Sequence, residues 1–129
     1  MSFNKASSEL NLISIRGGES WRLGEQVIWT DSYGNKITVP AGFTFDLASI
    51  PWFARWFVSN DDYRVRRPAA LHDYLYAWRG CTAGRILTRY QCDKLFFNAL
   101  VSEGMSIYKS FLMFLAVRVG GWYAWQSLN

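Results

Sequence analysis

The pattern of apolar and polar residues changes near the middle of the chain. Before residue 46, short apolar segments alternate with polar positions and are separated by glycine, proline, asparagine and aspartate, a pattern typical of antiparallel strands. The turn between two of these segments is predicted at residues 31–35, which include Asp31, Gly34 and Asn35. The predicted strands are residues 9–15, 21–29, 36–39 and 43–45. We therefore expect the first part of the chain to form a small antiparallel β-sheet.

From residue 49 onward the apolar positions recur at helical spacing. A short aromatic helix is predicted after Pro51, with Ser49 as its N-cap, because a serine hydroxyl can accept a first-turn N–H and proline tolerates that position. A second helix is predicted to begin at Pro68 and to end before Gly80, a residue suited to the left-handed conformation that follows many helices.

A capping box marks the next helix. The Thr88 hydroxyl and the Gln91 amide can each accept the other residue's backbone N–H, so a helix is predicted over residues 89–103. Asp93 is expected at the edge of its apolar face, near the positive end of the helix dipole. Residues 82–87, between this helix and the preceding one, are predicted to be a loop.

The last helix is predicted over residues 106–126, and because it is mostly apolar we expect it to lie in the core. The adjacent glycines Gly120 and Gly121 predict a bend or fraying there, followed by a tryptophan-rich tail that clamps the domain, meets a partner or meets a membrane interface. Lys109 and Arg118 interrupt the apolar run, so no transmembrane span is expected.

These elements predict one α+β domain over residues 1–129. Residues 1–46 are expected to be mainly strands, and residues 49–129 mainly helices. A small N-terminal antiparallel β-sheet is expected to pack against a C-terminal bundle of three to four helices. A chain of this length can bury about two thirds of the surface that it exposes when unfolded.

The composition of the chain indicates an interaction surface and an uneven distribution of charge. Aromatic residues make up 18% of the chain, more than a small core easily holds, which favours an exposed interaction surface. The first fifty residues carry four basic and five acidic side chains, and the remainder carries ten and five. Arg64, Arg66 and Arg67 are the candidates for anion binding. A solvated rim is the favoured interpretation, because no regular series of basic and aromatic residues indicates a nucleic-acid groove.

Candidate chemistry centres on His72, the chain's single histidine, which lies beside Asp73 in an apolar helix. Burying a neutral polar group without a partner costs roughly 2–7 kcal/mol, and a charge costs more. We therefore expect these side chains to find partners elsewhere. The residues predicted to form one polar cluster are Asp46, Ser49, His72, Asp73 and Asp93.

This predicted cluster has three interpretations. It can be architectural, with hydrogen bonds that hold the sheet against the helices. It can be catalytic, with His72 as a base and Asp46 and Asp73 as orienting groups. The same three residues could hold a divalent metal, although catalytic zinc normally has three protein ligands, commonly two or three of them histidines. Cys92 could form a thiol–imidazole pair with His72, but a cysteine on an apolar helix face is typically a core residue.

Three motifs resemble those of a phage and prophage family known only as the domain of unknown function numbered 1353 (DUF1353). Residues 45–51 read Phe-Asp-Leu-Ala-Ser-Ile-Pro, close to the family's Phe-Asp-Gly-Ala-Ser-Ile-Pro, with Leu47 in place of the glycine. Residues 70–76 and the later helix with Asp93 and Phe96 match in the same order. The resemblance extends over roughly residues 36–125.

The resemblance implies a phage or prophage origin without supplying an activity. Our leading hypothesis is a non-enzymatic structural or accessory protein of a virion, tail or lysis module, whose partners are other phage proteins or the bacterial cell envelope. One alternative is a small hydrolase that acts on peptidoglycan, either with or without a bound metal. A second alternative is a protein that binds nucleic acid or anions through the arginine cluster. The N-terminus has no apolar signal core, so we expect synthesis in the host cytoplasm, followed in the leading hypothesis by incorporation into the virion.

Overall fold

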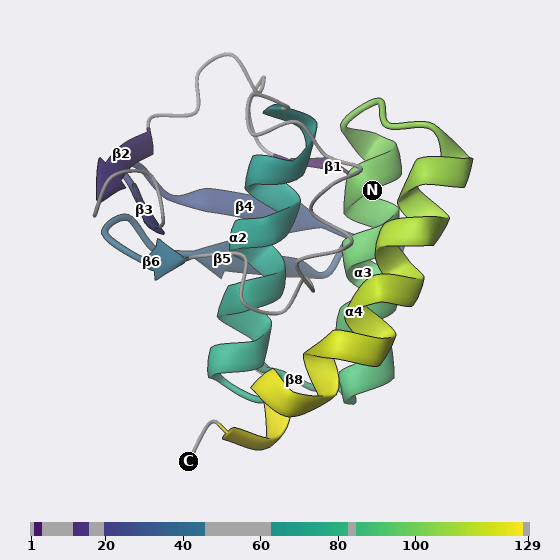
Figure 1. Cartoon of the computed structure of the whole chain (residues 1–129). Helices are drawn as coiled ribbons and strands as arrows, with labels where there is room; N and C mark the ends of the chain where they lie inside the picture. The colour runs from purple at the N-terminus through teal and green to yellow at the C-terminus, as the bar shows by residue number, and fades with distance from the viewer. Residues whose placement is uncertain (1, 4–11, 16–19, 46–62, 83–84, 128–129) are drawn as a thin grey trace.

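The computed structural model describes residues 2–3, 12–15, 20–45, 63–82 and 85–127 and has strands in its first part and helices in its second (Figure 1). The elements are β1 (Ser2–Phe3), β2 (Leu12–Ile15), β3 (Ser20–Leu23), β4 (Val27–Thr30), β5 (Lys36–Val39), β6 (Thr44–Phe45), α2 (Tyr63–Ala77), β7 (Cys81–Thr82), β8 (Arg85–Ile86), α3 (Arg89–Ser102) and α4 (Ile107–Ser127). The expected α+β arrangement is confirmed.

The strands of the N-terminal half form two three-stranded antiparallel sheets, ordered β1-β4-β5 and β2-β3-β6. The prediction of one strand over residues 21–29 is wrong, because the exposed residues 24–26 separate β3 from β4. Leu23, at the end of β3, and Val27 and Trp29, in β4, are all buried in the core.

The predicted turn at residues 31–35 is confirmed. Asp31 Oδ1 accepts the backbone N–H groups of Tyr33 and Asn35, each at 2.9 Å. This turn sets the register of β4 against β5, in which Trp29 lies opposite Ile37. Both side chains are buried, so the turn and the apolar pattern specify the same pairing.

Helix α2 lies between the strands and the other two helices, with contacts to β4, β5 and β6 on one side and to α3 and α4 on the other (Figure 1). The prediction that it begins at Pro68 is wrong, because α2 already includes Tyr63 and Pro68 lies inside it. A proline there removes one backbone hydrogen bond. Burial of Val65 and Arg67 holds the earlier turns in place.

Helix α2 ends at Ala77, and the turn that follows it includes a left-handed glycine, as expected. Gly80 has φ +80° and donates its N–H to Leu75 O at 2.7 Å. A Cβ on Gly80 would lie 1.9 Å from the backbone oxygen of Leu87, so glycine is required for this close approach. The predicted loop at residues 82–87 is wrong: β7 pairs with β8, and a further bond from Leu87 N–H to Gly80 O extends the ladder.

The capping box of α3 is confirmed. The Gln91 N–H donates to Thr88 Oγ1 at 3.1 Å, and the Thr88 N–H donates to Gln91 Oε1 at 2.9 Å. The helix ends at Ser102, one residue before the predicted end. The predicted fraying of the last helix is wrong, because α4 continues through Gly120 and Gly121.

Candidate functional site

The carboxylate of Asp93 is the meeting point of the three helices. Asp93 is 0% exposed, and its Oδ1 accepts from Tyr76 Oη at 2.5 Å and lies 2.7 Å from His72 Nε2. Its Oδ2 accepts from Arg118 Nη1 at 2.9 Å. Because a carboxylate can only accept hydrogen bonds, His72 must donate from Nε2. One side chain on α3 thus binds two on α2 and one on α4.

Arg89 completes the arrangement. Its Nη2 lies 4.0 Å from Asp93 Oδ2, and its Nε donates to Tyr76 Oη at 3.2 Å. The same Nη2 donates to the backbone oxygens of Val117 at 2.9 Å and Arg118 at 2.5 Å. We call His72, Tyr76, Arg89, Asp93 and Arg118 the Asp93 network.

Helical spacing explains why these residues converge. His72 and Tyr76 are four residues apart on α2, and Arg89 and Asp93 are four apart on α3, so each pair lies on one helix face. The two faces meet because α2 and α3 pack against each other. The apolar residues beside them, Leu75 and Cys92 among others, are buried in the same interface.

Aromatic rings enclose the imidazole. The His72 ring lies 4.2 Å from the Tyr76 ring and 4.8 Å from the Phe96 ring, measured between centroids, and His72 is only 1% exposed. Trp125 packs edge-on against Tyr76 at 5.1 Å. Gly121 permits this packing, since a Cβ there would lie 2.6 Å from Tyr76 Oη.

Burial sets the protonation of the network. Desolvation lowers the pKa of His72 below its ordinary value, the Asp93 hydrogen bond and charge oppose this, and the Arg89 charge adds to it. The imidazole is therefore neutral near pH 7, with its proton on Nε2. Desolvation, followed by the bond to Asp93, raises the pKa of Tyr76, so its phenol keeps its proton and donates.

The network therefore contains one negative charge beside two positive ones, with neutral imidazole and phenol groups as additional donors. Both carboxylate oxygens of Asp93 accept hydrogen bonds. Such an arrangement offsets the cost of burying the carboxylate. Chemically, it orients a histidine and holds three helices in one relative position.

A family model matches residues 21–117, which include α2, α3 and every member of the Asp93 network except Arg118. The chain belongs to the family described as Protein of unknown function (DUF1353). The resemblance seen in its motifs is thus confirmed. Comparisons with curated proteins and with solved structures found no match.

Of the residues predicted to cluster in this DUF1353 protein, the structure brings His72 and Asp93 together. Asp46 and Ser49 lie outside the described residues. Asp73 is half-buried on α2, about 100° around the helix axis from His72. Asp93 was expected at the edge of an apolar face near the helix dipole; it is instead fully buried, because partners from α2 and α4 neutralise it there.

Sequence reasoning missed three members of the network: Tyr76, Arg89 and Arg118. Helical spacing could have identified two of them, because Tyr76 follows His72 by four residues and Arg89 precedes Asp93 by four, which places each pair on one helix face. Nothing local connects Arg118 to Asp93, which is 25 residues away in the sequence.

Cys92 does not serve the network as a thiolate. The side chain is buried, and desolvation, with a contribution from the Asp93 charge, raises the pKa of the thiol to about 12. It remains a protonated thiol in the α2–α3 interface, where it packs as a small apolar group, as predicted.

The arginines predicted as an anion site lie on the first turns of α2. Arg67 is buried and binds Glu103 in bidentate geometry, with Nε–Oε2 at 2.8 Å and Nη2–Oε1 at 2.5 Å. Its guanidinium also lies 4.7 Å above the ring of Phe3. Arg67 therefore connects α2 to the end of α3 and to the N-terminal strand, and its donors are not presented to an external anion.

No group of three metal-ligating side chains occurs among the residues that the structure describes. The oxygens of Asp93 are bound to Tyr76 and Arg118, and cations beside a carboxylate disfavour a second cation there. Within the same part of the chain, no helix has both the length and the hydropathy of a membrane span.

Proposed function

We propose that this DUF1353 protein is a non-enzymatic structural or accessory component of a phage or prophage, acting in the virion, the tail or the lysis module. In this proposal the Asp93 network is architectural. The observation that carries it is the burial of His72 and Asp93, which are 1% and 0% exposed and bound to each other. The phage setting rests on the family resemblance of the motifs.

A general base must come within hydrogen-bond distance of the proton that it removes. The surroundings of His72 include the carboxylate of Asp93 and the rings of Tyr76 and Phe96. A peptidoglycan strand would need an open cleft that reaches the imidazole, and 1% exposure gives that hydrolytic alternative no support.

The exposed apolar residues of α4 are a second observation that supports a role in an assembly. Large apolar side chains that a monomer would normally bury are exposed on α4, including Phe111, Leu115 and Trp122. Large exposed apolar patches typically mark interaction sites. Aromatic residues are also enriched at the centres of protein interfaces.

The proposal can be tested with purified phage particles from a genome that encodes this chain. Mass spectrometry should detect the chain at a fixed copy number per particle, and a Glu25→Gln control should leave that number unchanged. A His72→Asn chain should reach the particle in proportion to its remaining folded fraction, as measured by circular dichroism.

A second experiment tests the alternative that the protein is a hydrolase. Purified natural protein should release no more soluble product from bacterial cell walls than the His72→Asn protein does. Absence of the chain from particles would contradict a virion or tail role. Wall hydrolysis that requires His72 in a folded variant would overturn the non-enzymatic proposal.

A further inference from the structure

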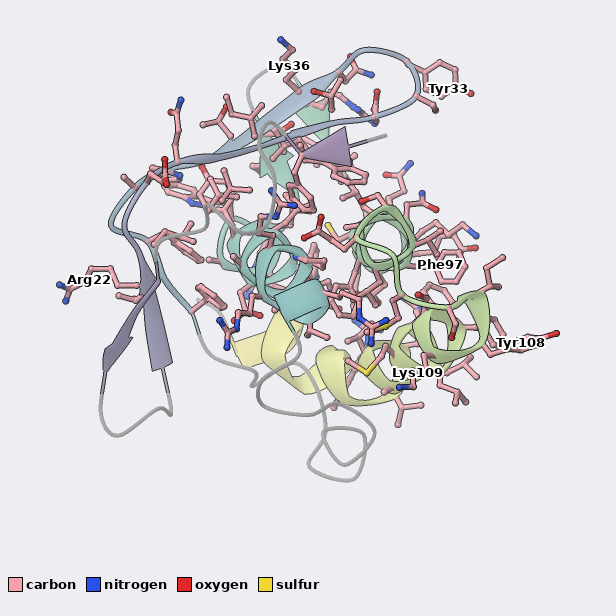
Figure 2. All side chains as sticks on the ribbon, turned by 90° about the horizontal axis from the view of Figure 1, so that it is seen from above. Arg22, Tyr33, Lys36, Phe97, Tyr108 and Lys109 are labelled. Atoms are coloured by element: carbon pink, nitrogen blue, oxygen red, sulfur yellow. The ribbon has the colours of Figure 1, made fainter. Side chains whose placement is uncertain are left out.

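The outer face of α4 consists of large apolar side chains that are between 43% and 84% exposed. We define it by these residues: Ile107, Tyr108, Phe111, Leu112, Leu115, Val119 and Trp122. Figure 2 shows Tyr108 projecting away from the body of the protein. The opposite face of the same helix, which includes Met113 and Val117, is buried against the other helices.

Five of these residues follow a heptad pattern. Tyr108, Leu112, Leu115, Val119 and Trp122 are separated by four, three, four and three residues. This spacing produces an apolar stripe along one side of a helix and is typical of a surface that packs against another helix.

The size of the face matches half of a stable interface. Side chains of this kind bury about 150–250 Å² each when aromatic and somewhat less when aliphatic, so seven of them at these exposures present roughly 800 Å². A standard interface buries about 800 Å² per partner, whereas the largest apolar patch of a typical monomer is about 300–600 Å².

We propose that the outer face of α4 binds the same face of a second copy of this chain, with the two helices antiparallel and a twofold axis near Leu115. The face is nearly symmetric about that residue. Tyr108 and Trp122 each lie seven residues from Leu115, and Leu112 and Val119 lie three and four residues from it. An antiparallel pair therefore places aliphatic groups at the centre and an aromatic ring at each end, as an isologous interface requires.

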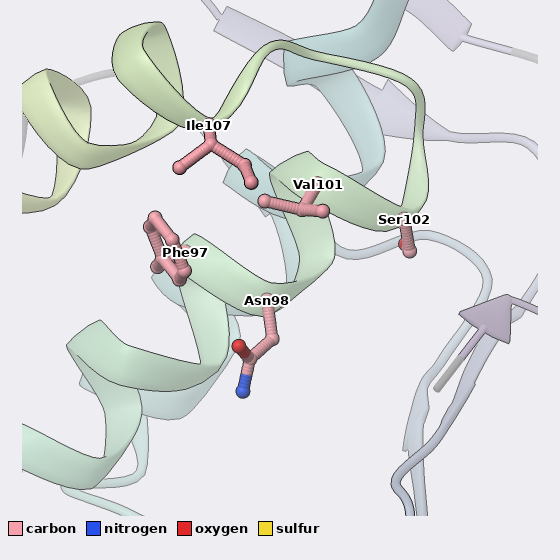
Figure 3. Close-up of a pocket in the computed structure, with 5 residues that line it drawn as sticks. All are labelled: Phe97, Asn98, Val101, Ser102 and Ile107. Carbon is pink, nitrogen blue, oxygen red and sulfur yellow. The ribbon is translucent and has the colours of Figure 1, made fainter.

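A groove at one end of the face fits this arrangement. It has a volume of about 290 Å³ and is lined by Phe97, Asn98, Val101, Ser102 and Ile107, where α3 ends and α4 begins (Figure 3). In the antiparallel pair, the Trp122 end of one copy lies beside the Ile107 end of the other. The indole of Trp122 can then fill the groove of the second copy, as buried aromatic anchors do in protein interfaces.

Charge favours the antiparallel direction. Lys109 is an exposed charged residue at the start of α4. In an antiparallel pair centred on Leu115, the two copies of Lys109 lie about 18 Å apart along the helix axis. A parallel pair in register would place them side by side. Arg118, near the middle of α4, is already bound to Asp93.

The first test compares the natural protein with two matched charge substitutions. Sedimentation over about 1–100 μM should show a concentration-dependent dimer for the natural chain. Val119→Glu, on the outer face, should raise the dimer dissociation constant at least about 100-fold. Ile86→Glu, at an equally exposed apolar residue on β8, should leave it unchanged within about threefold. Circular dichroism of both variants verifies that they are folded.

The second test examines the register of the pair. In a Cys81→Ser background, Leu115→Cys should form an intermolecular disulfide on mild oxidation, because side chains at a twofold axis lie within disulfide reach. Tyr33→Cys, on the exposed β4–β5 turn, should form far less. Equal cross-linking at the two positions would overturn the proposed register.

A natural chain that stays monomeric over the whole concentration range would overturn the proposal, including one that binds lipid vesicles or another protein through α4 instead. This inference goes beyond the proposed function, because dimer formation does not depend on whether the Asp93 network is catalytic. A monomeric result would leave the particle and cell-wall experiments unaffected, so the two proposals fail separately.

Discussion

The Asp93 network and the outer face of α4 lie on opposite sides of one helix, and each contains the residue types usual for the other location. The network places a carboxylate, a histidine and two arginines at the junction of three helices. The outer face places large apolar groups in contact with solvent. The charged groups in the interior have partners, whereas the apolar groups at the surface are exposed.

The two regions differ in what they contribute to the fold. Hydrogen bonds with fixed geometry allow α2, α3 and α4 to meet in one register, which apolar packing alone specifies less strictly. The exposed face adds nothing to the fold of an isolated chain and carries the cost of contact with water. The residues of the Asp93 network therefore organise the interior, and the outer face of α4 is the surface that we propose binds a second copy.

The largest effect is expected when the network loses its centre. Asp93→Ala leaves His72, Tyr76 and Arg118 without their common acceptor, and breaking a buried charge pair in this way typically costs about 3–5 kcal/mol. Urea denaturation at one fixed protein concentration measures the loss. Glu25→Gln, at an exposed carboxylate, should change the free energy of unfolding by less than about 0.5 kcal/mol. A comparable loss in both variants would contradict a special role for Asp93.

A smaller effect is expected from Gly121→Ala. The new methyl group would lie 2.6 Å from Tyr76 Oη, and overpacking of this kind typically costs about 1–3 kcal/mol. The cost should be smaller in a Tyr76→Phe background, because the closest contacting atom is then missing. A double-mutant cycle measured by thermal denaturation tests this coupling. Additive effects would show that the hydroxyl does not require glycine at this position.

The pH dependence of stability isolates His72. Its pKa in the folded protein lies below the unfolded value of about 6.5, so the unfolded chain takes up a proton first as the pH falls. The stabilisation from a neutral, buried His72 is fully present above about pH 6.5 and decreases below it, by at most about 1.4 kcal/mol per pH unit. His72→Asn should have a flatter profile between pH 7 and 5 in denaturant titrations. Parallel profiles would contradict the lowered pKa.

The smallest effect on folding is expected on the outer face. Val117 and Val119 are neighbours on α4, but Val117 is 0% exposed and Val119 is 72% exposed. Val117→Ala should cost about 2 kcal/mol through lost burial and a cavity. Val119→Ala should cost less than about 0.5 kcal/mol in the monomer and should weaken dimer formation. If Val117→Ala and Val119→Ala lowered the free energy of unfolding equally in dilute protein, the proposed difference between the buried and the exposed face of α4 would be wrong.

Elements with local determinants could be predicted from the sequence. The capping box of Thr88 and Gln91, the Asp31 turn and β5 are all defined by residues within a few positions of one another. The errors have tertiary causes. Pro68 lies inside α2 because Val65 and Arg67 are buried on the turns before it, and α4 stays helical through Gly121 because that glycine packs against Tyr76.

The candidate site was predictable only in part. His72 and Asp93 were identified from the cost of burying polar groups, but that argument names residues that need partners without saying which ones meet. The partnership of Asp93 with Arg118 depends on how α3 packs against α4, and a single sequence contains no local pattern for it. The prediction that the last helix lies in the core misses its exposed heptad, because an apolar stripe has the same pattern whether it faces the interior or a second chain.

The most direct test of a closed, architectural network is a nuclear magnetic resonance titration of His72, which as the single histidine gives one imidazole signal. We predict a neutral ring with its proton on Nε2, a pKa below 6.5 and protection of that proton from exchange with solvent. A pKa at or above 6.5, with rapid exchange, would show an imidazole open to water and would contradict the central claim.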